Sequence, residues 1–157
     1  MTKKTQRFTN ARLNAVQAIY SSQITDKPVA QIIFDFIHQN IGHDVLEEND
    51  FGEERFVPLA DADTELFSKI VQEATNRHIQ LDDIIFHSLS DGWDKDRIEI
   101  LLRSILRAGL AEFFVQPDLD APIIINEYTD IAASFYDGSE PKVVNAILDK
   151  FAKALRG

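Results

Sequence analysis

Few side chains of this sequence have the types and spacing that catalysis or metal binding requires. The four histidines are spread along the chain as His38, His43, His78 and His87, and none belongs to an HExxH motif. No serine lies in a GxSxG turn, and the six glycines form no phosphate-binding loop. Because there is no cysteine, a thiol nucleophile and thiolate metal ligands are excluded. We therefore expect no enzyme activity, no metal site and no cofactor.

Two weaker arrangements of these residue types could support a metal site or acid–base chemistry. His38 and His43 border an acidic segment and could hold a metal ion, but two surface histidines are the simpler interpretation. Adjacent acids such as Asp82 and Asp83 could do acid–base work. On a helix, however, neighbours in sequence point about 100° apart and do not converge on a substrate.

The charges are distributed unevenly along the chain. The net charge is −10, with 26 acidic and 16 basic residues. Residues 1–25 nevertheless contain four basic residues and no acidic one, so they carry +4 and leave −14 for the rest: these are Lys3, Lys4, Arg7 and Arg12. Two interpretations stay open. The segment is either a basic arm that contacts a polyanion or a frayed, solvated N-terminus.

The elements that must position these residues are predicted to be helices. Apolar residues recur with helical spacing, and few stretches alternate with period two, so we expect an all-α bundle of six to seven helices. The expected helices start at Thr9 or Asn10, cover 29–41, 63–77, 81–89 and 94–115, and follow caps at Asp120 and Ser139. The acidic segment 42–62 is expected to be a long solvated loop.

Two of these helices carry specific expectations. In the first, Leu13, Val16, Gln17 and Tyr20 share a face that should point inward, which leaves Arg12 free to reach solvent or a ligand. The helix 94–115 is apolar nearly all round, as is typical of a helix in the middle of a bundle. Its Gly109 indicates close approach by a neighbouring helix.

Length and hydropathy indicate a single domain over residues 1–157. No apolar run approaches the roughly 20 residues that a membrane-spanning helix needs. The basic N-terminus is not followed by an apolar stretch, as it would be in a secretory signal. We therefore expect a cytoplasmic protein with no membrane contact.

Three stretches, in order and spacing, carry a family resemblance. The first is Ala11-Arg12 with Ala15 to Tyr20 (AVQAIY), and the second is Trp93, Arg97, the run RSILR at 103–107 and Glu112. The third is Ile125-Asn126-Glu127 with the run VNAILDK at 144–150. Together they resemble the NusB family of bacterial transcription antitermination factors. The resemblance covers roughly 5–22 and 92–153, whereas 23–91 matches only in helical character.

The resemblance implies a NusB-like fold of two three-helix subdomains with a connecting helix, and it implies no catalysis. The N-terminal subdomain would cover about 8–90 and the C-terminal one about 93–157. NusB-type proteins bind the single-stranded boxA element of ribosomal RNA leaders together with the ribosomal protein NusE, within the RNA polymerase antitermination complex. The alternative is a protein-interaction module of the same fold that does not bind RNA. A homodimer is compatible with either.

The resemblance also implies an RNA-binding surface on the first and last helices. Its residues would be Lys3, Lys4, Arg7, Arg12, Gln17, Tyr20, Lys142 and Asn145. Packing is an alternative role for Tyr20, and capping of a neighbouring helix is one for Asn145. The salt slope is the slope of log K for RNA binding against the logarithm of the salt concentration. With about four basic contacts, this slope should be only about −3 for a single strand.

Three positions depart from the family pattern. Phe8-Thr9-Asn10 stands where the family has a dense arginine run, Leu102 replaces an acidic residue, and Val143 replaces a phenylalanine. The first departure predicts weak RNA affinity without a partner. Since ribosomal proteins are typically basic, acidic residues outside the basic segment 1–25 should steer the association of NusE electrostatically. The candidates are Glu99, Glu112, Asp118 and the 44–54 segment.

Overall fold

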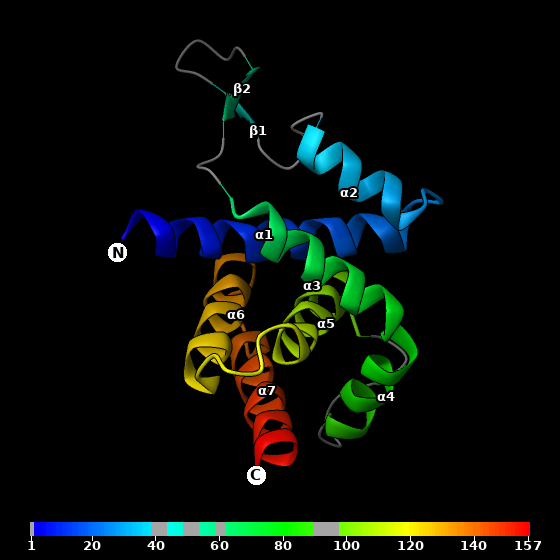
Figure 1. Cartoon of the computed structure of the whole chain (residues 1–157), viewed down its shortest axis with the longest axis vertical. Helices are drawn as coiled ribbons and strands as arrows, with labels where there is room; N and C mark the ends of the chain where they lie inside the picture. Colours follow the sequence, from blue (N-terminus) through cyan, green and yellow to red (C-terminus); the bar gives the residue numbers. More distant parts are fainter. Residues whose placement is uncertain (1, 39–43, 49–53, 59–61, 90–97) are drawn as a thin grey trace.

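The computed structural model describes residues 2–38, 44–48, 54–58, 62–89 and 98–157. Within these ranges the chain forms seven helices and one antiparallel hairpin (Figure 1). In chain order the elements are α1 (Lys3–Ile24), α2 (Val29–His38), β1 (Asp44–Glu48), β2 (Glu54–Pro58), α3 (Thr64–Asn76), α4 (His78–Ser88), α5 (Ile100–Val115), α6 (Ala121–Phe135) and α7 (Glu140–Arg156). The helical bundle predicted from the sequence is confirmed.

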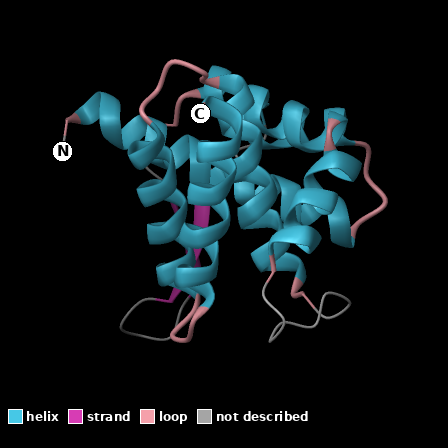
Figure 2. Ribbon diagram, turned by 90° about the horizontal axis from the view of Figure 1, so that it is seen from below, coloured by secondary structure: helices cyan, strands magenta, loops and turns pink. Residues whose placement is uncertain are grey.

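The helices pack in two groups around α5. In the first group α1 and α2 pack with α3, and in the second α6 and α7 pack with α5. Helix α5 also packs on α1 and α3 and so joins the groups, while α4 packs mainly on α5. Viewed from below, helices make up nearly all of the described chain (Figure 2). The subdomain boundary expected near 90–93 lies outside the described residues.

Helix α5 forms the centre of the core, as its composition predicted. Its buried residues include Leu102, Ile105, Leu106, Leu110 and Phe113. A Cβ atom added at Gly109 would lie 3.0 Å from Leu148 Cδ1 and 3.3 Å from Tyr128 Cδ2. The close helix approach predicted at this glycine is therefore confirmed.

Helix α1 begins six residues earlier than predicted. Thr2 occupies the N-cap, and its hydroxyl accepts a hydrogen bond of 3.0 Å from the backbone N–H of Thr5. The backbone N–H of Asp63 donates to the carbonyl oxygen of Arg7 at 3.1 Å, which ties the second turn of α1 to the start of α3. The expected start at Thr9 or Asn10 and the interpretation as a frayed segment are both wrong.

The predicted inward face of α1 is only partly correct: Val16 is fully buried and Leu13 packs against the core, but Gln17 and Tyr20 point outward. Tyr20 is 36% exposed and Leu13 and Gln17 are partly exposed, whereas the buried side contains Ala11, Arg12, Ala15, Val16 and Ile19. The buried face places small alanines and the polar Arg12 and Asn14 beside Val16 and Ile19, so an apolar stripe marks it poorly. The face predicted from the larger residues is therefore rotated about the helix axis relative to the observed buried face.

The segment 42–62 contains strands rather than only a loop. β1 and β2 pair antiparallel, with Asp44 opposite Pro58 and Glu48 opposite Glu54. Figure 1 shows the two strands projecting from the α1 side of the molecule, away from α6 and α7. The expectation of a continuous loop is wrong for these residues, because strand formers such as Val45, Phe56 and Val57 outweigh the charge count. The rest of the segment, Ala62 aside, lies outside the described residues.

The remaining helix ends agree with the predictions to within a few residues. Asp63 is the N-cap of α3, whose predicted range began at this residue, and its Oδ1 accepts from the backbone N–H of Leu66 at 2.8 Å. Asp120 and Ser139 occupy the cap positions of α6 and α7 but make no side-chain capping bond. Helix α4 starts at His78, three residues early, and Ile98 and Glu99 precede α5 rather than belong to it. Residues 39–41 and 94–97, also predicted as helix, lie outside the described residues.

Candidate nucleic-acid interface

The first two turns of α1 present three exposed cationic side chains. Lys3, Lys4 and Arg7 are all exposed, and no acidic residue in the described part of the chain pairs with them. They lie at the N-terminal end of a helix, where the helix dipole adds positive potential. With Phe8 and Asp63 they line one surface hollow. This arrangement can bind an anion such as a phosphate group.

Gln17 and Tyr20 lie further along the same helix on its outward side. Gln17 is partly exposed and Tyr20 is exposed. At 1.5 Å per residue, Tyr20 lies roughly 20 Å from Arg7 along the helix axis. The two groups share one rigid helix but not one pocket.

Lys142 and Asn145 occupy a different helix. Both are exposed on the first turns of α7, which packs mainly on α6 and α5. Asn145 makes no side-chain hydrogen bond with the described residues, so it does not cap a described helix. Val143, at the position where the family has phenylalanine, is half-buried.

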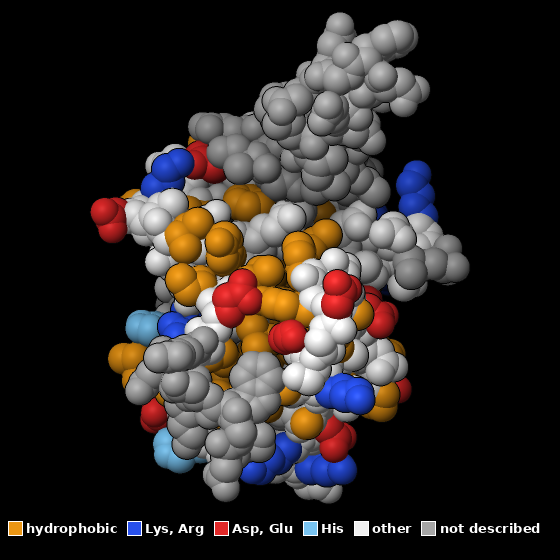
Figure 3. Space-filling model, turned by 180° about the vertical axis from the view of Figure 1, so that it is seen from behind, with side chains coloured by type: hydrophobic (Ala, Val, Ile, Leu, Met, Phe, Trp, Pro, Cys, Tyr) orange, Lys and Arg blue, Asp and Glu red, His pale blue; other side chains and the backbone are white. Residues whose placement is uncertain are grey.

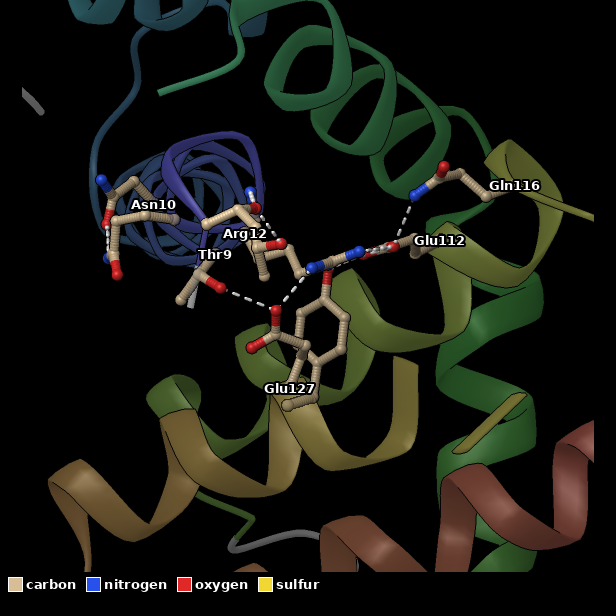
Figure 4. A network of polar contacts seen from close by, with 10 residues as sticks. Thr9, Asn10, Arg12, Glu112, Gln116 and Glu127 are labelled. Atoms are coloured by element: carbon tan, nitrogen blue, oxygen red, sulfur yellow. Dashed lines mark hydrogen bonds and ion pairs between the residues drawn. The ribbon is translucent and has the colours of Figure 1, made fainter. Parts of the chain in front are cut away.

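Arg12 has a role that its sequence pattern did not reveal. Its Nε donates to both carboxylate oxygens of Glu112, at 2.8 and 3.0 Å, and its Nη2 donates to Glu112 Oε2 at 2.8 Å. Its Nη1 donates to Glu127 Oε1 at 2.7 Å. Figure 4 shows the guanidinium reaching from α1 toward the two carboxylates on α5 and α6. One side chain thus connects three helices.

Three further side chains complete this network. The hydroxyl of Tyr128 donates to Glu112 Oε1 at 2.7 Å, and Gln116 Nε2 donates to Glu112 Oε2 at 2.8 Å. Thr9 donates to Glu127 Oε1 at 2.7 Å. Each oxygen of Glu112 therefore has at least two donors, which compensates for its complete burial.

The network shifts the pKa values of two of its members. Burial by itself would lower the pKa of Arg12, but the hydrogen bond and charge of Glu112 outweigh burial and raise it. Burial, followed by the negative charge of Glu112, raises the pKa of Tyr128 well above its ordinary value. Arg12 therefore stays charged and Tyr128 stays a neutral donor, and both protonation states suit the buried carboxylate.

These positions correct two expectations. Arg12 is 3% exposed, so it does not reach solvent as predicted, and its part in RNA binding stays a prediction. Glu112 is fully buried and bound to Arg12, so it presents no charge to a basic partner. By contrast, Glu99 and Asp118 are exposed. The side chains of the 44–54 segment lie outside those that the structure describes.

The face turned away from Figure 1 gathers hydrophobic side chains near its centre, with acidic side chains among them (Figure 3). Separately, Ile24 of α1 is 52% exposed and Ile100 of α5 is 37% exposed. Gln23 Nε2 donates to Ser104 Oγ at 2.5 Å, which places the last turn of α1 beside the first turns of α5. Apolar groups with nearby carboxylates can contact a basic protein surface.

The metal-binding and acid–base sites that the sequence left open are not found among the described residues. Among them, no three His, Asp or Glu side chains are placed to hold a metal ion. Asp82, weighed for acid–base work, accepts two hydrogen bonds from Arg107, at 2.9 and 2.7 Å. His43 lies outside the described residues. None of the helices described is both long and apolar enough to cross a membrane.

Comparison with known proteins identifies the family. Residues 9–153 match the NusB family model. The chain is 35% identical over 156 residues to the transcription antitermination protein NusB of Sphingopyxis alaskensis, with 99% of each chain covered. It is 39% identical over 157 residues to the NusB of Rhodospirillum rubrum, with 96% of this chain and 85% of that protein covered. The chain belongs to the NusB family.

Solved NusB structures share its fold. Thermotoga maritima NusB superposes with a TM-score of 0.69 at 20% identity, covering 92% of this chain and 89% of that one. A chain from a crystal structure of "Antitermination Factors NusB and NusE in complex with dsRNA" superposes with a TM-score of 0.68 at 20% identity, covering 93% and 96%. In this NusB-family chain, Arg12, Glu112 and Glu127 each come from a different one of the three stretches that carried the resemblance. Their contact explains part of that pattern.

Proposed function

We propose that this NusB-family protein is a non-catalytic RNA-binding adaptor in transcription antitermination. It would bind the boxA element of ribosomal RNA leaders together with NusE and act within the RNA polymerase antitermination complex. The observation that carries the proposal is the exposed, unpaired cationic turn of α1 on an otherwise acidic chain. The NusB–NusE–dsRNA complex among its structural neighbours supports both partners.

We assign the RNA contacts to the exposed members of the predicted set. Lys3, Lys4, Arg7 and Lys142 would contact phosphates, while Gln17, Tyr20 and Asn145 would contact bases or sugars. Arg12 acts as a positioning residue, because its guanidinium holds α1 against α5 and α6. Four phosphate contacts keep the expected salt slope near −3.

The partner surface is proposed at the junction of α1 and α5. Ile24 and Ile100 supply exposed apolar area, and the exposed carboxylate of Glu99 lies directly before α5. Glu99 accepts a hydrogen bond of 2.7 Å from Tyr136, which fixes its position. Such a surface suits a basic ribosomal protein. Homodimer formation through the same surface stays a prediction.

The decisive experiment is a titration of fluorescent single-stranded boxA RNA at two salt concentrations, with and without NusE. We expect tight binding only with NusE, and weakening at higher salt. The triple variant K3Q/K4Q/R7Q should lose affinity and reduce the salt slope by about 2, while its NusE binding stays intact. The double variant K150Q/K153Q removes exposed charge from the far end of α7 and should change neither. If no RNA binds while the NusE complex still forms, the protein is an interaction module without RNA recognition.

A further inference from the structure

We propose that two adjoining hollows at the junction of α1, α3 and α5 receive one unpaired RNA nucleotide, whose base stacks on Phe8. This inference rests on the proposed RNA-binding function and deepens it. It assigns a base-binding role to a residue that replaces one of the arginines expected from the family. On this inference Lys3, Lys4 and Arg7 form the edge of a defined pocket and are more than a general phosphate-binding surface.

The two hollows share a wall. One is lined by Lys3, Lys4, Arg7, Phe8 and Asp63. The other is lined by Phe8, Asp63, Glu65, Leu66, Lys69, Val115 and Gln116. Since Phe8 and Asp63 line both, a nucleotide can place its phosphate in the first and its base in the second.

The second hollow offers apolar surface mainly at Phe8, while most of its exposed lining is polar. Phe8 is half-buried and packs against the core, so its ring is held in place while part of it stays accessible. Leu66 and the partly exposed Val115 extend the apolar wall. Nζ of Lys4 lies over the Phe8 ring, 5.9 Å from its centroid. A base that stacks on the ring therefore displaces this ammonium group, which can then contact the phosphate attached to the base. Aromatic rings of this kind are the common stacking platforms for unpaired bases.

The polar groups around the hollow are largely hydrogen-bond acceptors. Asp63 is held by its capping bond to Leu66, and its second carboxylate oxygen has no partner among the described residues. Gln116 donates its amide N–H to Glu112, so its Oε1 is available as an acceptor. The charge of Glu65 is offset by Lys69, 2.9 Å away. These acceptors suit a base with an exocyclic amino group, such as adenine or cytosine.

Stacking also accounts for the sparse charge of the arm. An arginine contributes to RNA affinity mainly through its charge, and that contribution weakens with salt. A phenylalanine contributes through stacking, which is largely independent of salt. The chain can therefore retain RNA affinity with few cations, provided that one base of the RNA is unpaired.

The test is a titration of boxA RNA with the NusE complex of wild-type protein and of F8L, F8W and the control F34L. Phe34 is exposed on α2, away from both hollows. The probes are single-stranded boxA RNA, a series with one abasic site at each position, and the fully paired duplex. Thermal melting of each variant checks that F8L leaves the fold intact.

We expect F8L to weaken single-strand binding roughly 5- to 100-fold with an unchanged salt slope, while F8W and F34L bind like wild type. One abasic position should cause the same loss in wild type and no further loss in F8L. Duplex binding should not depend on Phe8. If F8L binds normally, or loses affinity equally for every abasic RNA and the duplex, the inference is overturned although RNA binding stands. If the wild-type complex binds no RNA, the proposed function fails as well.

Discussion

Arg12 holds three helices together through charges that are almost completely removed from water. Guanidinium binds a carboxylate through two parallel bonds, and this geometry is met at Glu112, where Nε of Arg12 donates to Oε1 and Nη2 donates to Oε2. A buried pair of this kind adds little net stability compared with apolar residues, but removing one partner leaves the other uncompensated. The fold therefore requires Arg12, because without it the buried carboxylate of Glu112 has no compensating charge.

We predict that R12M lowers the free energy of unfolding by about 3–5 kcal/mol, measured by urea denaturation. R12K should also destabilise, because an ammonium group cannot form the two parallel bonds. The double variant R12M/E112L should recover part of the loss, since the fully buried carboxylate of Glu112 is removed together with its partner. The control R7M changes an exposed arginine of the same helix and should stay within about 0.5 kcal/mol of wild type. An R12M midpoint equal to that of R7M would contradict the role of the network.

The sequence indicated which residues form the Arg12 network, but it did not predict their structural role. Arg12, Glu112 and Glu127 all belong to the stretches that carried the resemblance. The sequence nevertheless predicted RNA contact for Arg12, steering of NusE for Glu112 and no role for Glu127. A charged residue is normally expected at the surface. One signal was present: Glu112 is a carboxylate in a helix that is apolar nearly all round, so it requires a buried partner.

At the scale of elements, the contact of α5 with α6 and α7 depends on the missing side chain of Gly109. Leu148 and Tyr128 are both fully buried, and their side chains occupy the space that a Cβ atom would need. Alanine would strengthen the helix by about 1 kcal/mol, but it would overpack this contact.

We predict that G109A is destabilised by about 1 kcal/mol net, as a lower melting temperature in thermal unfolding. In the double variant G109A/L148A, the methyl group occupies part of the vacated space. Its destabilisation should therefore be smaller than the sum for the two single variants. A108G, at the adjacent buried alanine, reports the ordinary effect of removing a methyl group from α5. Strict additivity, or a G109A variant more stable than wild type, would argue against a tight contact.

The positions of the helices could be predicted from sequence more accurately than their rotation. Periodic apolar residues locate α3, α5, α6 and α7, because these helices bury large side chains. Helix α1 buries alanines and polar residues beside Val16 and Ile19, so its apolar pattern predicts the wrong rotation. Its start is earlier than predicted because Thr2, and not Thr9 or Asn10, is the N-cap. The hairpin was not predicted because each strand pairs with residues outside its own stretch of sequence, and strand pairing is not a local property.

At the scale of the whole molecule, the charge separation should govern the rate of association with NusE. Residues outside the first 25 carry a net −14, obtained by subtracting +4 from −10. We predict that the association rate falls by about tenfold or more from low to high salt, measured by stopped-flow fluorescence. D118K should slow association without changing dissociation, because Asp118 is exposed and unpaired among the described residues. An association rate that does not change with salt would rule out steering.

The capped, helical start of α1 has a consequence for the thermodynamics of RNA recognition. Many basic arms are disordered until they bind, and ordering each residue then opposes binding by about 1–2 kcal/mol of conformational free energy. Here Thr2 caps the helix, and the bond from Asp63 to Arg7 fixes its second turn before any ligand arrives. An arm folded in advance avoids most of this entropy loss, so three cations can achieve what a longer flexible arm needs many more to do.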